Sequence, residues 1–155
     1  MEREKVIAEI GRLRSAGRRI VFTNGCFDLL HCGHVRYLQE ARLLGDLLVV
    51  GLNSDASVRK IKGPKRPINP QHERAEVLSA VGCVDYVILF DEPDPLALIT
   101  RVRPRILVKG ADWPVDKIIG AEEVIAAGGR VERVELVPQT STTDIIERIV
   151  KRYGS

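Results

Sequence analysis

His31 and His34 are the residues whose type and spacing point most directly to chemistry. They enclose Cys32 and Gly33, after an apolar run that ends at Phe22 and directly before a helical pattern. The two imidazoles therefore fall where a strand turns into a helix. Such a turn offers unpaired N–H groups and the positive end of the helix dipole, and a glycine there lets a ligand approach the backbone. The spacing predicts a phosphate-binding site.

Further donor side chains follow later apolar runs. A proline-rich basic stretch, 60–70, comes after the run 47–51, and it fits either a solvated loop or a basic arm over a phosphate. Because the carboxyl ends of parallel strands meet at one edge of a sheet, we expect these donors to share one site. The candidates in this group, besides the two histidines, are Lys62, Lys65, residues 109–113 and residues 141–143.

The elements that must position these residues follow from hydrophobic periodicity. Apolar runs without alternation indicate strands buried on both faces, and the alternating stretch 131–137 indicates an edge strand. The predicted strands are 20–22, 47–51, 84–90, 106–108 and 131–137, and the predicted helices are 2–16, 33–44, a short one ending near 61, 71–81, 95–102, 121–127 and 144–152. This alternation predicts an α/β fold, a single Rossmann-like domain with a doubly wound, parallel, five-stranded sheet. Residues 1–17 would form an N-terminal helix and residues 18–155 the α/β core.

Composition narrows the class of protein. The 155 residues carry a net charge of +3 with acids and bases well mixed, which gives no reason to expect a nucleic-acid partner. No apolar run approaches the roughly 20 residues of a membrane span, and the charged N-terminus lacks the apolar core of a secretory signal, so we expect a cytoplasmic protein with no membrane partner. The three cysteines form no Cys-x-x-Cys pair, which favours free thiols over disulfides or a zinc site.

Several reactions can be set aside or favoured on motifs. The P-loop, Gly-x-Gly-x-x-Gly and Gly-x-Ser-x-Gly patterns are absent. Imidazoles, lysines, hydroxyls and helix N-termini match phosphoryl or nucleotidyl transfer, where catalysis is mainly positioning and charge stabilisation.

Trp113 fits either a loop anchor or a pocket wall, and Asp112 could bind a ribose hydroxyl or hold Mg²⁺ through water. The hydroxyls of residues 141–143 fit a helix cap, a phosphate site, or both.

Residues 24–34, Asn-Gly-Cys-Phe-Asp-Leu-Leu-His-Cys-Gly-His, resemble the signature of the cytidylyltransferase-like nucleotidyltransferases with the His-x-Gly-His motif. Residues 109–113 and 141–143 resemble later motifs of that family, in the same order, and the resemblance runs from about residue 19 to 148. Within the family, residues 49–59 and 62–70 are most similar to the D-glycero-β-D-manno-heptose 1-phosphate adenylyltransferases. In many bacteria that domain is fused behind a sugar kinase.

The resemblance implies a nucleotidyltransferase fold, ATP as substrate with Mg²⁺, a sugar 1-phosphate as acceptor, and a homodimer. AMP would pass to D-glycero-β-D-manno-heptose 1-phosphate, giving ADP-heptose and pyrophosphate for surface-glycan synthesis. His31 and His34 would hold the phosphates, with one of Lys62 and Lys65, preferably Lys65, as a third catalytic group. The remaining residues implied to bind the nucleotide are Thr23, Gly25, Cys26, Phe27, Asp28, Gly33, Arg74, Lys109, Gly110, Asp112, Trp113, Ser141, Thr142 and Thr143.

Alternative functions remain open at this point. A cytidylyltransferase for a polyol phosphate such as glycerol 3-phosphate, or an adenylyltransferase making a cofactor, would use the same fold. The glycerol 3-phosphate branch carries Arg-Tyr before its Val-Asp and Gly-Ile before its Ser-Thr-Thr, whereas this chain has Gly82-Cys83 and Gln139-Thr140. These departures favour ATP over CTP. A nucleotide-binding regulatory module without catalysis is the alternative from another class.

Overall fold

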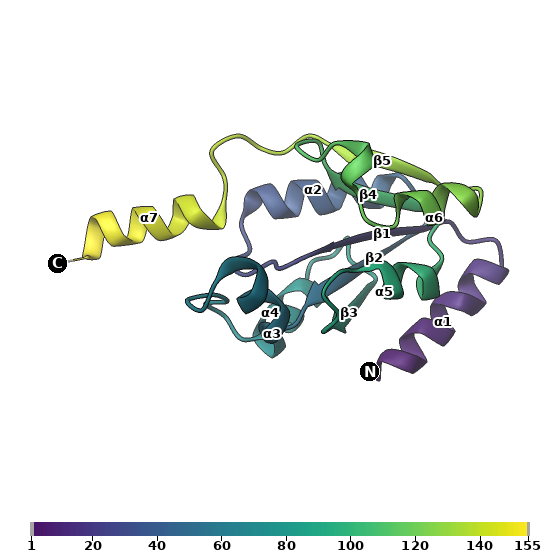
Figure 1. Ribbon diagram of the computed structural model, residues 1–155, viewed down its shortest axis with the longest axis horizontal. Coiled ribbons are helices and arrows are strands. Elements are labelled where there is room, and N and C mark those ends of the chain that lie inside the picture. Colours follow the sequence, from purple (N-terminus) through teal and green to yellow (C-terminus); the bar gives the residue numbers. More distant parts are fainter. Residues whose placement is uncertain (1, 155) are drawn as a thin grey trace.

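The computed structural model describes residues 2–154, which build a five-stranded sheet whose strand pairs are all parallel (Figure 1). The strand order is β3-β2-β1-β4-β5, so the chain winds outward from β1 in one direction and then resumes at β4 on the other side of it. The strands are β1 (Ile20–Gly25), β2 (Leu47–Asn53), β3 (Tyr86–Phe90), β4 (Ile106–Gly110) and β5 (Arg130–Val134). The predicted doubly wound sheet is confirmed.

Helices cover both faces of this sheet because the central strands carry apolar side chains on both. On one face Phe22 and Leu107 pack with residues of α1, α5 and α6; on the other Val21 and Val50 pack with residues of α2 and α4. The helices are α1 (Arg3–Ser15), α2 (Cys32–Leu43), α3 (Asp55–Lys62), α4 (Gln71–Ser79), α5 (Leu96–Val102), α6 (Ala121–Ala126) and α7 (Thr142–Tyr153).

The predicted bounds of all five strands need correction. β2 and β4 each continue two residues past their predicted ends, to Asn53 and Gly110. β1 continues past Phe22 to Gly25, since the whole segment pairs with β2. β3 begins at Tyr86, because Val84 belongs to a turn closed by its N–H bonding the carbonyl of Val81. β5 ends at Val134, three residues before the predicted end, and a short 3₁₀ helix at Val115–Lys117 was not predicted.

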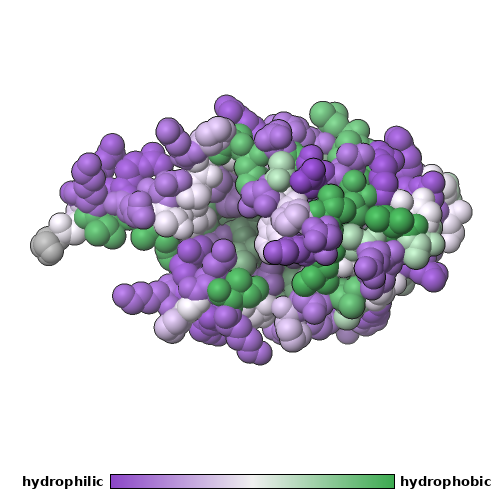
Figure 2. Space-filling model, turned by 45° about the horizontal axis from the view of Figure 1, so that its top comes forward, coloured by the Kyte–Doolittle hydropathy of each residue, from purple (hydrophilic) through white to green (hydrophobic). Residues whose placement is uncertain are grey.

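α7 differs from the other helices in its environment. It projects away from the body of the molecule (Figure 1), and within the described residues none of its side chains is buried. Ile149, Val150 and Tyr153 are exposed by 51%, 60% and 82%. In Figure 2 this projecting arm carries hydrophilic residues on its upper side and hydrophobic residues along its lower side. The helix therefore presents an apolar face that the rest of the chain leaves uncovered.

Candidate active site

A cavity of about 460 Å³ opens at the carboxyl edge of the sheet, beside the point where the strand order reverses between β1 and β4. Ligands of open α/β sheets bind in such a crevice. Figure 2 shows a hollow next to the base of the projecting α7. The predicted residues that line the cavity are Gly25, Cys26, Phe27, Asp28, His31, Gly33, His34, Lys62, Lys109, Gly110, Asp112, Trp113, Ser141, Thr142 and Thr143.

The two histidines form one unit at the start of α2. His31 is the N-cap residue, and its Nδ1 accepts a hydrogen bond from the backbone N–H of His34 at 3.4 Å. The two rings stack with centroids 3.8 Å apart, and the Phe27 ring lies 5.1 Å from that of His34. Because Nδ1 of His31 is an acceptor, its proton lies on Nε2, which leaves an N–H donor for a ligand.

Burial keeps both imidazoles neutral at pH 7. It lowers the pKa of His34 to about 4, with a further contribution from the neighbouring His31. Burial also lowers the pKa of His31, which Asp144 partly opposes. The Nδ1 atom of His34 is buried and has no hydrogen-bond partner of good geometry within residues 2–154, although the backbone of Leu29 acts on the ring and raises its pKa against the effect of burial. Buried polar atoms are normally paired, so a water molecule or a small turn of the ring would satisfy this nitrogen.

Gly33 is required by close packing rather than by its backbone conformation. A Cβ atom at this position would lie 2.7 Å from Oγ1 of Thr140 and 3.0 Å from the His31 ring. Any larger residue would push the connection to α7 away from the histidines. The glycine thus brings the start of α7 next to the start of α2.

Ser141 caps α7 at the rim of the cavity. Its hydroxyl accepts from the N–H of Asp144 at 3.1 Å and donates to Oδ2 of the same residue at 2.6 Å. Thr142 and Thr143 line the cavity in the first turn of the helix. Two helix N-termini, those of α2 and α7, therefore contribute to one cavity, an arrangement that favours an anion with several negative charges.

Asn24 is a lining residue that sequence reasoning missed. Its Oδ1 accepts a hydrogen bond of 2.7 Å from Nζ of Lys109. Burial lowers the pKa of Lys109 to about 8, against the opposing effects of Cys26 and Asp112. The signal was available, since a polar side chain ending a buried strand is unusual, but the predicted strand stopped at Phe22.

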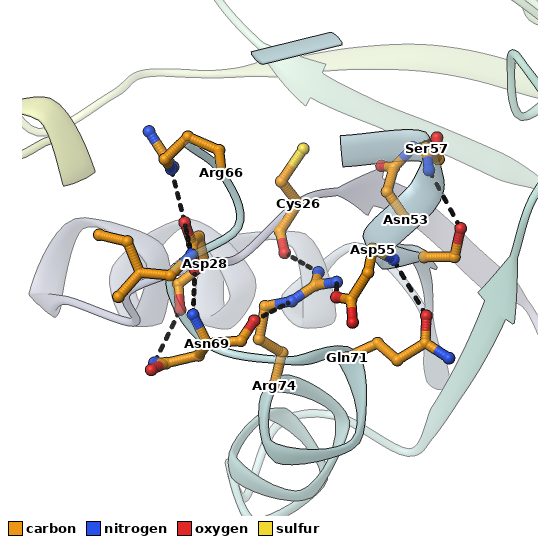
Figure 3. A network of polar contacts seen from close by, with 11 residues as sticks. Cys26, Asp28, Asn53, Asp55, Ser57, Arg66, Asn69, Gln71 and Arg74 are labelled. Carbon is orange, nitrogen blue, oxygen red and sulfur yellow. Dashed lines mark hydrogen bonds and ion pairs between the residues drawn. The ribbon is translucent and has the colours of Figure 1, made fainter. Parts of the chain in front are cut away.

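The Asp28 carboxylate organises the basic loop rather than pointing freely into the cavity. It accepts from Nε of Arg66 at 2.6 Å and from the backbone N–H groups of Ile68 and Asn69, each at 2.9 Å (Figure 3). Its pKa is lowered because these hydrogen bonds outweigh the cost of its burial. The loop held in this way brings Lys62 and Arg66 to the cavity, whereas Lys65 is exposed and does not line it.

Arg74 lies outside the cavity and ties three segments together (Figure 3). Its guanidinium donates to the carbonyl of Cys26 at 2.6 Å, the carbonyl of Asn69 at 3.0 Å and Oδ1 of Asp55 at 2.8 Å. The side chain of Arg74 is fully buried in doing so. The structure therefore places Arg74 behind the wall of the cavity, where the predicted contact with a nucleotide is replaced by contacts with the protein.

Thr23 is likewise buried behind the wall. Its hydroxyl lies 2.8 Å from the hydroxyl of Tyr37, and Tyr37 is the member of the pair that lines the cavity. Burial raises the pKa of Tyr37 to about 12, so its phenol stays protonated. Tyr37, Arg66 and Thr140 were not among the predicted site residues, because no short motif distinguishes them.

The described residues offer little to a resident metal ion. Within residues 2–154 there is no group of three or more His, Cys, Asp or Glu side chains placed to hold one. Asp28, the acidic residue deepest in the wall, already has its carboxylate occupied by hydrogen bonds within the protein.

No helix in the described part of the chain is long and apolar enough to cross a membrane.

A parallel sheet with a polyphosphate-sized cavity at its switch point, lined by two helix starts, two histidines and basic side chains, defines a nucleotide-binding α/β protein. The cytidylyltransferase-like family matches residues 22–148. The chain belongs to this family and is a nucleotidyltransferase, as the His-x-Gly-His resemblance predicts.

Relatives of known sequence agree with this assignment. The chain is 60% identical over 141 residues to the bifunctional protein HldE of Geobacter sulfurreducens, which covers 91% of this chain and 29% of that protein. It is 58% identical over 147 residues to the bifunctional protein HldE of Syntrophotalea carbinolica, covering 95% of this chain and 30% of that protein. The chain thus spans less than a third of these relatives.

Solved structures share the fold. A lipopolysaccharide core biosynthesis protein from Thermoplasma volcanium is 33% identical, with a TM-score of 0.65, over 78% of this chain and 98% of that one. A protein from Archaeoglobus fulgidus, 21% identical, has a TM-score of 0.57 over 80% of this chain and 93% of that one. The second match bears on the fold alone.

Proposed function

We propose that this protein transfers AMP from ATP to D-glycero-β-D-manno-heptose 1-phosphate, forming ADP-heptose and pyrophosphate for a lipopolysaccharide or other surface glycan. The observation that carries the reaction type is the stacked His31–His34 pair, beside a buried lysine and two helix N-termini in one cavity. The choice of heptose rests on the resemblance of residues 49–59 and 62–70 to the heptose 1-phosphate adenylyltransferases. The lipopolysaccharide core biosynthesis protein among the similar structures supports a role in surface-glycan synthesis.

In this reaction an oxygen of the acceptor phosphate attacks the α-phosphorus of ATP, and the bond from that phosphorus to pyrophosphate breaks. Neutral His31 and His34 would donate N–H groups to the phosphates, and the start of α7 at residues 142–143 would bind the β- and γ-phosphates. Lys62 and Arg66 would reach the polyphosphate from the basic loop. The attacking phosphate is already an anion, so no residue has to remove a proton.

Mg²⁺ would arrive bound to the triphosphate of ATP, where it supplies charge neutralisation. The chain offers one free carboxylate at the cavity, that of Asp112, and no cluster of ligands within residues 2–154. This donor set fits a magnesium ion held mainly by phosphate oxygens and water, with Asp112 reaching it through water.

The assay for this function offers the purified protein ATP or CTP with Mg²⁺ and a panel of sugar 1-phosphates and glycerol 3-phosphate. We expect pyrophosphate release and an ADP-sugar by mass spectrometry, with the heptose 1-phosphate preferred. Activity with CTP and none with ATP would overturn the choice of nucleotide. Tight ATP binding without turnover of any acceptor would instead support a regulatory module.

We also expect a homodimer, as in the family that the chain resembles, and the uncovered face of α7 is a candidate contact. Ile149, Val150 and Tyr153 are exposed there together. Light scattering of the protein and of Val150→Glu, with Leu43→Glu on α2 as a control at another exposed position, tests this expectation. A monomeric wild-type protein would contradict it.

A further inference from the structure

The pairing of Asn24 with Lys109 joins the two strands that flank the switch point. In the register of β1 and β4, Phe22 lies opposite Leu107. The residues two positions later, Asn24 and Lys109, are next to last in their strands and lie on the same face of the sheet. The Nζ atom donates to the amide oxygen of Asn24 at 2.7 Å, and both residues line the cavity. The ammonium group is thus fixed where the two halves of the sheet separate.

The charge on Lys109 is left without a bonded counter-ion. Its hydrogen-bond partner within residues 2–154 is a neutral amide. The nearest acidic groups are Cys26, which carries a thiol, and Asp112, which is exposed to solvent. The other ionisable groups lining the cavity are neutral His31 and His34, the protonated phenol of Tyr37, the cation Lys62, and the Asp28 carboxylate, which is paired with Arg66. A largely buried ammonium held by an amide is costly unless an anion completes its surroundings.

We propose that Asn24 is a positioning residue that holds the Lys109 ammonium, uncompensated, against the phosphoryl group that is transferred. This inference rests on the proposed function. The nucleotide and the acceptor must meet in the crevice at the switch point, and Lys109 lies there, next to last in β4. A bond forms between an acceptor phosphate oxygen and the α-phosphorus, and the departing pyrophosphate takes the electron pair of the broken bond. Lys109 keeps its protons throughout and stabilises charge on the α-phosphate oxygens.

To have this role, residue 24 must carry an amide rather than a carboxylate. Aspartate has nearly the same shape as asparagine and would hold Nζ equally well. It would also neutralise the ammonium, and the ion pair would then compete with the phosphate. Asn24 therefore orients the cation without consuming its charge, in contrast to Asp28, which pairs with Arg66 in the neighbouring loop.

The first experiment compares pH–rate profiles of Asn24→Asp, Lys109→Met and wild type, with Lys117→Met at an exposed position as a control. We expect kcat/KM for ATP in the wild type, which reports the free protein, to fall above about pH 8 as Lys109 loses its proton. Asn24→Asp should lower kcat roughly ten-fold and move this alkaline limb upward by at least about one pH unit, because a carboxylate stabilises the ammonium. Lys109→Met should lower kcat roughly 10²-fold and abolish the limb. A lower rate in Asn24→Asp with an unmoved limb would indicate a merely structural asparagine and overturn the proposal.

A second measurement does not depend on turnover. In protein labelled with ¹³C at the lysine ε-carbon, the Lys109 signal is identified by its loss in Lys109→Met and followed through a pH titration. Binding of a non-hydrolysable ATP analogue should raise the pKa of Lys109, and Asn24→Asp should raise it without the analogue. If the protein transfers AMP to no acceptor but this titration moves as described, the proposed function fails while the role of the pair stands. If bound analogue leaves the titration unchanged, the pair does not face the α-phosphate.

Discussion

Two polar clusters lie side by side at the carboxyl edge of the sheet, and they treat charge in opposite ways. The Asp28 carboxylate and the Arg74 guanidinium are each matched to several partners within the chain (Figure 3). Around His34 and Lys109, the imidazole has an unpaired buried nitrogen and the ammonium has a neutral partner. The first cluster is complete as it stands, whereas we propose that an anion completes the second.

This difference separates residues that build the site from residues that use it. Motif resemblance groups Asp28, Arg74, His34 and Lys109 together, since all are polar and near one another. Hydrogen-bond partners divide them, because a group whose bonds are all made within the protein has little left for a ligand. Substitutions in the first cluster should therefore change stability, and those in the second should change turnover.

The largest effect is expected at Arg74. Arg74→Met removes the guanidinium and leaves the Asp55 carboxylate and two carbonyls without their partner. Breaking a buried pair on one side typically costs about 3–5 kcal/mol, and we expect a loss of that size in the free energy of unfolding measured with urea. Arg59→Met, at an exposed position of α3, is the control and should change stability by less than about 0.5 kcal/mol. A small loss in Arg74→Met would contradict the division between the clusters.

The second effect concerns acid stability and arises from His34. The pKa of His34 is about 4 in the folded protein against 6.5 for the free side chain. Between pH 4 and pH 6.5 the unfolded chain therefore binds a proton at this residue more readily than the folded protein does. Stability should therefore be complete above pH 6.5 and fall as the pH drops towards 4, by up to about 3 kcal/mol. Urea unfolding at several pH values measures this loss. His34→Gln should reduce the loss and His72→Gln, on the exposed surface of α4, should not; equal losses in both variants would rule out His34 as the cause.

The sequence was sufficient for the sheet and for the position of the site, because both depend on local patterns. Apolar runs placed the five strands, and the His31–His34 spacing placed the two imidazoles at the start of a helix, where the structure has a cavity. The roles of Asp28 and Arg74 were not accessible in this way. Their partners lie 38 to 48 positions away in the sequence, at Arg66 and Cys26, and only the packed fold brings them together. Asn24 was missed because the predicted strand stopped at Phe22, and its pairing with Lys109 in another strand becomes visible in the fold.

The third effect is on turnover. His34→Ala should lower kcat by roughly 10²-fold or more, since a preorganised donor to the phosphates is lost. Pyrophosphate release measures the rate, and circular dichroism establishes that the fold is retained. His72→Ala serves as the control for removal of a histidine. If purified His34→Ala turns over as fast as the wild type, the assignment of this cavity as the active site is contradicted.

The smallest effect distinguishes Lys62 from Lys65. The sequence resemblance favours Lys65 as the catalytic lysine, but the loop anchored by Asp28 directs Lys62 to the cavity and leaves Lys65 in solvent. Lys62→Ala should raise the KM for ATP about ten-fold, the loss of one charged hydrogen bond of roughly 1.4 kcal/mol, while Lys65→Ala should change it by less than about two-fold. Initial rates over a range of ATP concentrations measure both. If Lys65→Ala has the larger effect, the loop must rearrange around the bound nucleotide, and the Asp28 anchor then belongs to a moving part of the site.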